Sequence, residues 1–143
     1  MKKLLLIMVA VLTMLPAQAQ IQRKTSSSYD VVATSRVGFI QVVCVKEMYI
    51  AMMPTNNRYD KVMMFFLGEN RESAEQSISD MIDIMQEVTD EENKTITIEN
   101  KIGSDLHVSK GMRINIRSKN FAGYVETTKK EWEQLLESLR ESK

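Results

Sequence analysis

The sequence has 143 residues, a single cysteine and 19 basic residues against 19 acidic ones. This balance gives no electrostatic reason to expect binding to nucleic acid or to an anionic membrane. One cysteine cannot form an internal disulfide, so a folded form in an oxidising compartment must be stabilised by the burial of its core.

The first 19 residues have the three parts of a secretory signal peptide. Two lysines follow Met1, Leu4 to Leu15 is apolar, and residues 17–19 (Ala-Gln-Ala) supply small residues for cleavage. The apolar stretch is shorter than the about 20 residues that span a bilayer. We therefore predict cleavage after Ala19 and export to the periplasm or the medium. The mature chain would have no stable membrane anchor, since the lone cysteine lies far from its N-terminus.

Residues 20–28 are polar and aperiodic, which predicts a flexible leader. The remaining residues, 29–143, are expected to form a single domain. Three apolar segments follow, and they predict a meander of strands covered on both faces. They run over Val37 to Val45, Met48 to Met53 and Val62 to Leu67.

An amphipathic helix is predicted after Gly68. Apolar residues recur at steps of three and four and indicate one buried stripe, made of Ala74, Ile78, Met81, Ile82, Met85 and Val88. Ser73 and Gln76 have the spacing of a capping box, with Asn70 as an alternative N-cap. The acidic residues that follow oppose the helix dipole, so the helix should end by about Thr89.

The second half of the chain repeats this order. Strands are predicted over Thr95 to Glu99, around Ile114 and over Phe121 to Glu126, with a further short one at Leu106 to Val108. These strands alternate and should have one solvated face. A last helix begins at Thr128, which forms a capping box with Glu131. Its buried stripe is expected to contain Trp132, Leu135, Leu136 and Leu139.

Together these segments predict the α+β class: one mostly antiparallel sheet of about six strands, covered by two amphipathic helices. The expected order is βββα-βββα, with the first three strands at the centre of the sheet. The repeated order hints at an ancient duplication, although the residues of the two halves do not match.

Cys44 and His107 are the only thiol and the only imidazole, so a Cys-His nucleophile would have to use this pair. Cys44 lies in an apolar strand, where a thiol is usually a small inert hydrophobe. His107 lies between two apolar residues and should point to the solvated face. The chain also has no G-x-S-x-G elbow, no S-x-x-K and no phosphate-binding glycine loop, so we predict no enzymatic activity and no cofactor.

Acidic residues follow one face of the first helix and continue beyond its end. A calcium site is one reading of them, but a calcium loop of the EF-hand type needs a central glycine, which is missing. A solvated surface explains these residues better. They are Asp80, Asp83, Glu87, Asp90, Glu91 and Glu92. Asn93-Lys94-Thr95 also matches a glycosylation sequon, although the bacterial type of signal argues against glycosylation.

Methionine is concentrated in two neighbouring predicted strands, in Met48, Met52, Met53, Met63 and Met64. A core filled with pliable side chains is the simplest interpretation. The alternatives are an adaptable apolar surface for a partner and thioether binding of Cu(I). Since neighbours in a strand point to opposite faces, Met52 and Met53 cannot share one site, which weakens the copper alternative.

A basic strip follows the outer alternation of a later strand, with Lys110, Arg113, Arg117 and Lys119. It is interpreted as edge charge that discourages aggregation, or as a surface for an anionic glycan or an acidic partner. Interleaved aromatic residues are absent, so nucleic acid is not expected.

The sequence therefore predicts a small exported module that binds a protein partner or itself, without catalysis. The alternative is a binder of an apolar or soft-metal ligand at the methionine-rich sheet face, and the third hypothesis is a Cys-His enzyme. The candidate partner surface consists of Met52, Met53, Met63, Met64, Lys110, Arg113 and Arg117.

Overall fold

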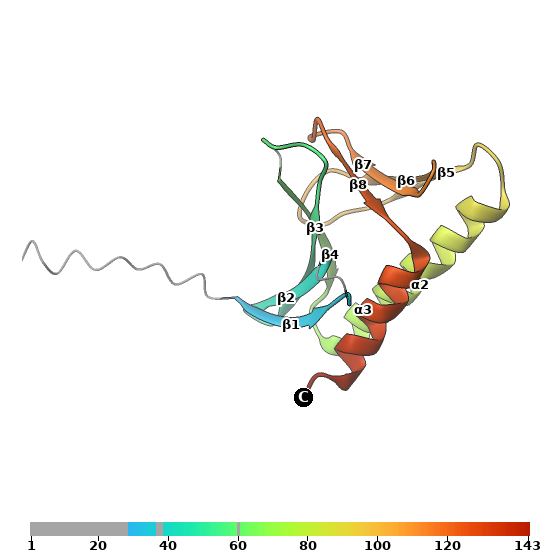
Figure 1. Cartoon of the computed structure of the whole chain (residues 1–143). Coiled ribbons are helices and arrows are strands. Elements are labelled where there is room, and N and C mark those ends of the chain that lie inside the picture. The colour runs from blue at the N-terminus through green and yellow to red at the C-terminus, as the bar shows by residue number, and fades with distance from the viewer. Residues whose placement is uncertain (1–28, 37–38, 60) are drawn as a thin grey trace, which may run out of the picture.

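A computed structural model of the chain describes residues 29–36, 39–59 and 61–143. The predicted signal peptide and leader lie outside these residues. The described part is an α+β fold with two four-stranded antiparallel sheets and two helices (Figure 1). Each sheet is a meander whose strands pair in chain order, and each meander is followed by a helix.

The first meander pairs its strands in the order β1-β2-β3-β4. Lys46 and Glu47 connect β2 to β3 with φ angles of 47° and 69°, the left-handed pair of a tight hairpin turn. The strands are β1 (Asp30–Thr34), β2 (Gln41–Val45), β3 (Met48–Pro54) and β4 (Val62–Gly68).

The second meander has the order β5-β6-β7-β8 and lies between the two helices in the chain. Its strands alternate buried and less buried residues, as the sequence predicts for one solvated face. The elements are α2 (Arg71–Asp90), β5 (Thr95–Ile98), β6 (Leu106–Lys110), β7 (Ile114–Ser118), β8 (Tyr124–Thr127) and α3 (Lys129–Glu141).

The predicted class is confirmed, but the prediction of one sheet with about six strands is wrong. There are two sheets and eight strands, in the order ββββα-ββββα. The two additional strands are β1, a short edge strand that directly follows a serine-rich segment and was not predicted, and β6, which was predicted only as a further short strand. Two sheets form because each strand pairs only with its neighbours in the chain and α2 lies between the two meanders. Among the described residues, no strand of one meander pairs with a strand of the other.

The start of α2 corrects the predicted cap. Asn70 is the N-cap: its side chain accepts a hydrogen bond from the Ser73 amide at 2.8 Å. Ser73 is the third helical residue and completes the capping box, so the predicted Ser73–Gln76 pairing is wrong and the Asn70 alternative is correct. A β-carbon on Gly68 would lie 2.0 Å from the Ser73 hydroxyl oxygen, so this tight connection requires glycine.

The acidic end of α2 is neutralised by Lys94, which follows the helix. Its ammonium group donates hydrogen bonds to the carboxylates of Glu87 and Glu91. These bonds, with Glu87 contributing most, raise the pKa of Lys94 above its ordinary value of 10.5. The helix can therefore extend to Asp90, one residue beyond the predicted end, although no basic residue lies in its last turn.

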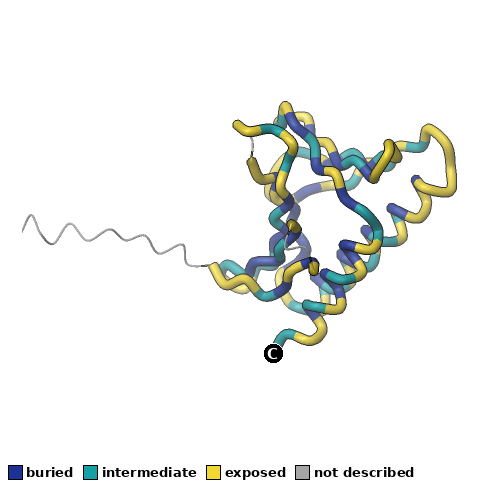
Figure 2. The backbone as a smooth tube through the Cα atoms, in the orientation of Figure 1, coloured by how far each residue is buried: buried dark blue, intermediate teal, exposed yellow. Residues whose placement is uncertain are grey.

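The two sheets and the helix pair surround one hydrophobic core (Figure 1). Both helices pack against the first sheet from the same side, and α2 also packs against β5 and β6 of the second sheet. Figure 2 shows the result along each helix, where buried and exposed residues alternate. The predicted stripes are confirmed, apart from Ile82, which is half-buried.

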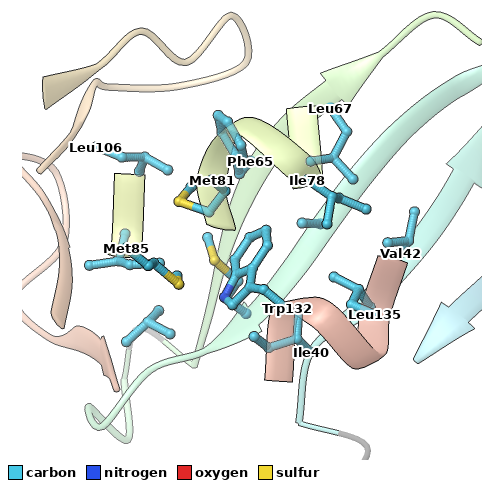
Figure 3. Packing of buried hydrophobic residues seen from close by; sticks show 14 of the residues in the cluster. Ile40, Val42, Phe65, Leu67, Ile78, Met81, Met85, Leu106, Trp132 and Leu135 are labelled. Carbon is cyan, nitrogen blue, oxygen red and sulfur yellow. The ribbon is translucent and has the colours of Figure 1, made fainter. Parts of the chain in front are cut away.

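Trp132 lies at the centre of this core, among residues of both helices and the first sheet (Figure 3). It has no exposed surface, and its indole N–H donates to the Thr127 hydroxyl at 3.1 Å. The Thr127 hydroxyl in turn donates to Glu131 at 2.8 Å. Glu131 also accepts from the Thr128 amide and from Arg113, which confirms the predicted capping box and compensates its burial.

Two asparagine side chains hold the meanders together by pairing with the edges of the sheets. Asn100, which follows β5, donates to the Met64 carbonyl at 3.0 Å and accepts from the Phe66 amide at 3.2 Å. The side-chain oxygen of Asn56, in the turn before β4, accepts a hydrogen bond from the Tyr124 backbone amide at 2.9 Å. The backbone amide of Asn56 donates to the Tyr124 carbonyl. An asparagine of each meander thus forms hydrogen bonds with backbone groups of an edge strand of the other meander, β4 in one case and β8 in the other.

Candidate functional site

The outer face of the second sheet is polar, as expected for a solvated sheet face. Its central row runs across all four strands through Thr97, His107, Arg117 and Tyr124. Thr97 Oγ1 lies 2.9 Å from His107 Nδ1, and the Arg117 guanidinium lies 4.6 Å from the centre of the Tyr124 ring. These side chains therefore pair with one another along the row.

The outer face of the first sheet is apolar. One cross-strand row consists of Val31, Val43, Ile50 and Phe66. The adjacent row places Met52 next to Met64, with Gln41 beside them. We call Val31, Val43, Ile50, Phe66, Met52 and Met64 the outer apolar face.

Burial separates this face from the core. The opposite row of the same sheet, with Val42, Ala51 and Phe65, belongs to the core cluster, whereas Val43 and Ile50 are buried without belonging to it. The margins of the face are open, with Val31 48% exposed and Met64 49% exposed. Since both helices lie against the inner side of the sheet, they do not cover this one (Figure 1).

The structure divides the four predicted methionines between the two sides of the sheet. Met53 and Met63 pair across β3 and β4 and are 0% and 1% exposed, so they belong to the core and cannot contact a partner. Met52 and Met64 pair on the outer apolar face. Cu(I) binding at this face stays a prediction, with two of the four thioethers on the outer side.

The prediction that β4 has little water on either face is wrong. Its buried side chains are Met63, Phe65 and Leu67, followed by the buried Gly68, while Val62 and Met64 on the other side are exposed. An unbroken apolar run normally marks a strand covered on both faces. Here the run is apolar because one side fills the core and the other forms the outer apolar face.

The predicted basic strip does not form a continuous surface with the methionines, since its residues belong to the second sheet and its turns. Arg113 forms an ion pair with Glu131, 3.2 Å apart, and Arg117 stacks on Tyr124. Lys110 donates to the Thr89 carbonyl at the end of α2. All three have partners within the chain.

Cys44 and His107 are placed in different sheets. Cys44 is half-buried in β2, where it pairs with Asp30 and Tyr49. His107 lies on the outer face of the second sheet, as predicted, and points away from the core that Leu106 and Val108 fill. The structure therefore does not assemble the Cys-His pair.

Four of the six acidic side chains along and beyond α2 have local partners. Asp80 accepts from Gln76 and Asp90 accepts from Gln86, each at 2.8 Å, while Glu87 and Glu91 bind Lys94. Across residues 29–36, 39–59 and 61–143, no three His, Cys, Asp or Glu side chains are grouped so that they could hold a metal ion.

A groove of about 460 Å³ runs beside the edge of β4, between that strand, α2 and the end of β5. Phe66, Ile84 and Ile98 contribute apolar surface, and Asp80 and Glu99 contribute carboxylates. Lys101 lies 5.5 Å from the centre of the Phe66 ring, at the boundary between this groove and the outer apolar face. The groove therefore adjoins that face and has both apolar and charged residues in its lining.

Sequence reasoning missed Val31 and Phe66 as surface residues. Val31 belongs to the strand that was not predicted, and Phe66 lies in the run that was interpreted as buried on both sides. The alternation of two neighbouring strands contains the necessary signal, because Ile50, Met52, Met64 and Phe66 share one parity once β3 and β4 are paired.

The fold and this surface define a small two-sheet α+β domain with one polar and one apolar outer sheet face. Comparisons with protein-family models, with curated proteins and with solved structures gave no match to this chain. In the part of the chain that the structure describes, neither helix has the length and apolar character needed to cross a membrane.

Proposed function

We propose that this protein is an exported, non-catalytic interaction module that binds a protein partner through the outer apolar face. The observation that carries the proposal is the contrast between two sheets of one molecule. The outer row of the second sheet is polar throughout, whereas the equivalent row of the first sheet is valine, isoleucine and phenylalanine. Val31 and Met64 at the margins of this face are about half exposed, and exposed apolar surface of this kind is typical of a protein interaction site.

Methionine at the margin of the face supports the same proposal. Met52 and Met64 are unbranched and polarisable, so they adapt to the shape of a bound surface. Export is part of the proposal on the basis of the N-terminal signal pattern alone. The absence of an assembled Cys-His pair removes the sequence-based reason for an enzymatic alternative that uses these two residues.

Replacing Met64 with glutamate tests the proposal. We expect the wild-type mature chain, in dilute solution, to bind an apolar fluorescent dye, and Met64→Glu to lose most of that binding, because a charge at the open margin opposes an apolar ligand. Fluorescence titration measures the binding. Circular dichroism should show an unchanged fold, since Met64 is half exposed.

The matched control is Thr97→Glu, which adds the same charge to the outer face of the second sheet, where Thr97 is exposed. It should leave dye binding unchanged. Met53→Glu is unsuitable as a test because Met53 is buried and a glutamate there would unfold the sheet. Wild-type protein that binds no dye and is monomeric would contradict the proposed function.

A further inference from the structure

We propose that the groove beside β4 binds an arginine or lysine side chain of an extended segment in a partner protein. This inference rests on the proposed function, since it names a chemical feature of the same partner. The groove adjoins the outer apolar face at Phe66, so one partner can contact both. Its volume of about 460 Å³ lies within the range of about 300–1,000 Å³ that is usual for ligand sites.

A face of α2 beside the buried stripe forms one wall of the groove. It consists of Ser73, Ser77, Asp80 and Ile84, which follow one another at steps of three and four residues. Ile98 of β5 adds a second isoleucine, and both isoleucines are half-buried. The groove therefore offers apolar surface that the methylene stem of a long side chain can cover.

Three carboxylates from separate segments line the same groove. Glu69 follows β4, Asp80 lies on α2 and Glu99 follows β5, and all three side chains are exposed. Asp80 accepts a hydrogen bond from Gln76. Among the described residues, none of the three carboxylates forms an ion pair. Their negative charge is therefore open to a cation from outside the chain.

Lys101 is the only cation in the lining, and it does not neutralise these carboxylates. Its ammonium group lies 5.5 Å from the centre of the Phe66 ring, at the border with the outer apolar face. Three carboxylates against one ammonium group give the lining a net charge of −2. A cleft of one charge sign with apolar walls concentrates ligands of the opposite sign.

The edge of β4 adds a backbone acceptor to the groove. Asn100 pairs with the Met64 carbonyl and the Phe66 amide, as a residue of a neighbouring strand would. The amide and the carbonyl of one residue point to the same side of an antiparallel strand, so the Phe66 carbonyl also faces away from β3. An extended segment in the groove can donate a backbone hydrogen bond to this carbonyl.

The hydrogen-bonding groups of the groove select a donor. The hydroxyls of Ser73 and Ser77 already donate within the chain, to the carbonyls of Asn70 and Leu67. The carboxylates and the Phe66 carbonyl only accept. Arginine and lysine combine a donor cation with an aliphatic stem. We expect arginine to bind more tightly, because a guanidinium pairs with a carboxylate through two parallel hydrogen bonds.

Isothermal titration calorimetry of the mature chain with a short peptide of alternating alanine and arginine, blocked at both ends, tests the inference. The expected result is saturable binding that Asp80→Lys weakens by about tenfold, because a repulsive charge replaces an attractive one in the groove. The equivalent lysine peptide should bind more weakly, and a glutamate peptide should not bind. Circular dichroism should show an unchanged fold, since Asp80 is exposed.

Asp83→Lys is the matched control. It makes the same change of charge on the same helix, at an exposed residue that does not line the groove. It should weaken peptide binding by less than about twofold, because charges outside the groove are screened by salt. Both variants should bind the apolar dye as the wild-type chain does, since neither changes the outer apolar face.

Three results would overturn the inference. A wild-type chain that binds none of the peptides would have no such site, and equal weakening by Asp80→Lys and Asp83→Lys would show unspecific charge attraction. Binding of free arginine amide as tight as that of the arginine peptide would make the ligand a small amine instead of a protein segment. In each case, dye binding that Met64→Glu removes would leave the proposed function standing without this groove.

Discussion

Replacement of Trp132 by alanine is expected to lower the free energy of unfolding by about 3–5 kcal/mol. The side chain is fully buried where both helices meet the first sheet, so its removal leaves a cavity bordered by three elements. It also leaves the Thr127 hydroxyl without the indole donor. Since domains of this size are stable by only about 5–15 kcal/mol, a large fraction of the stability would be lost.

Urea unfolding followed by far-ultraviolet circular dichroism measures this effect in every variant, including those without tryptophan. Trp132→Phe should cost less than Trp132→Ala because it retains most of the volume. Glu137→Ala, at an exposed position of the same helix, should have little effect. A loss of less than about 1 kcal/mol for Trp132→Ala would show that this residue is not central to the core.

Replacement of Asn100 by alanine is expected to destabilise the protein by about 2–3 kcal/mol, because it leaves a carbonyl and an amide at the edge of β4 without their partner. The side chain is 6% exposed and forms hydrogen bonds with Met64 and Phe66. Hydrogen exchange provides a local readout: the Phe66 amide should exchange faster in the variant. The stability change is measured by urea unfolding.

Asn100→Asp sharpens the test. It retains an acceptor for the Phe66 amide but replaces the donor to the Met64 carbonyl with an oxygen, so it should be at least as destabilising as alanine. Asn120→Ala, in an exposed turn, is the control. Unchanged exchange of the Phe66 amide in Asn100→Ala would show that Asn100 does not hold the edge of β4.

The local elements of this fold could be predicted from the sequence because their signals are local. The stripe from Ala74 to Val88 and the stripe of α3 follow helical periodicity, and most of their members are buried. The Thr128–Glu131 box also depends only on neighbouring residues. The division into two sheets could not be predicted, since it depends on pairing between strands and on where α2 packs.

The candidate site shows the same limit on a smaller scale. Alternation requires Met52 and Met53 to point to opposite sides of β3, but it does not say which side meets the helices. That choice depends on Met53 and Met63 joining the cluster around Trp132. It leaves Met52 and Met64 on the outer side. The two methionine-rich strands therefore contribute one pair of methionines to the core and another pair to the outer apolar face.

The two structural roles of Asn100 and Lys101 connect the fold to the proposed interaction. Asn100 forms side-chain hydrogen bonds with the Met64 carbonyl and the Phe66 amide at the edge of β4, so these two groups are not open to pairing with a strand of another chain. Lys101 lies over Phe66 at the border of the outer apolar face.

Methionine oxidation by dilute peroxide, mapped by peptide mass spectrometry on the folded protein, tests most directly whether the outer apolar face is open. Met112 is fully exposed and serves as the reference, while Met53 and Met63 are buried. In protein too dilute to associate, we predict that Met64 oxidises at least about tenfold faster than Met63 and Met53, because susceptibility follows exposure. Protection of Met64 equal to that of Met63, while Met112 reacts, would contradict the account.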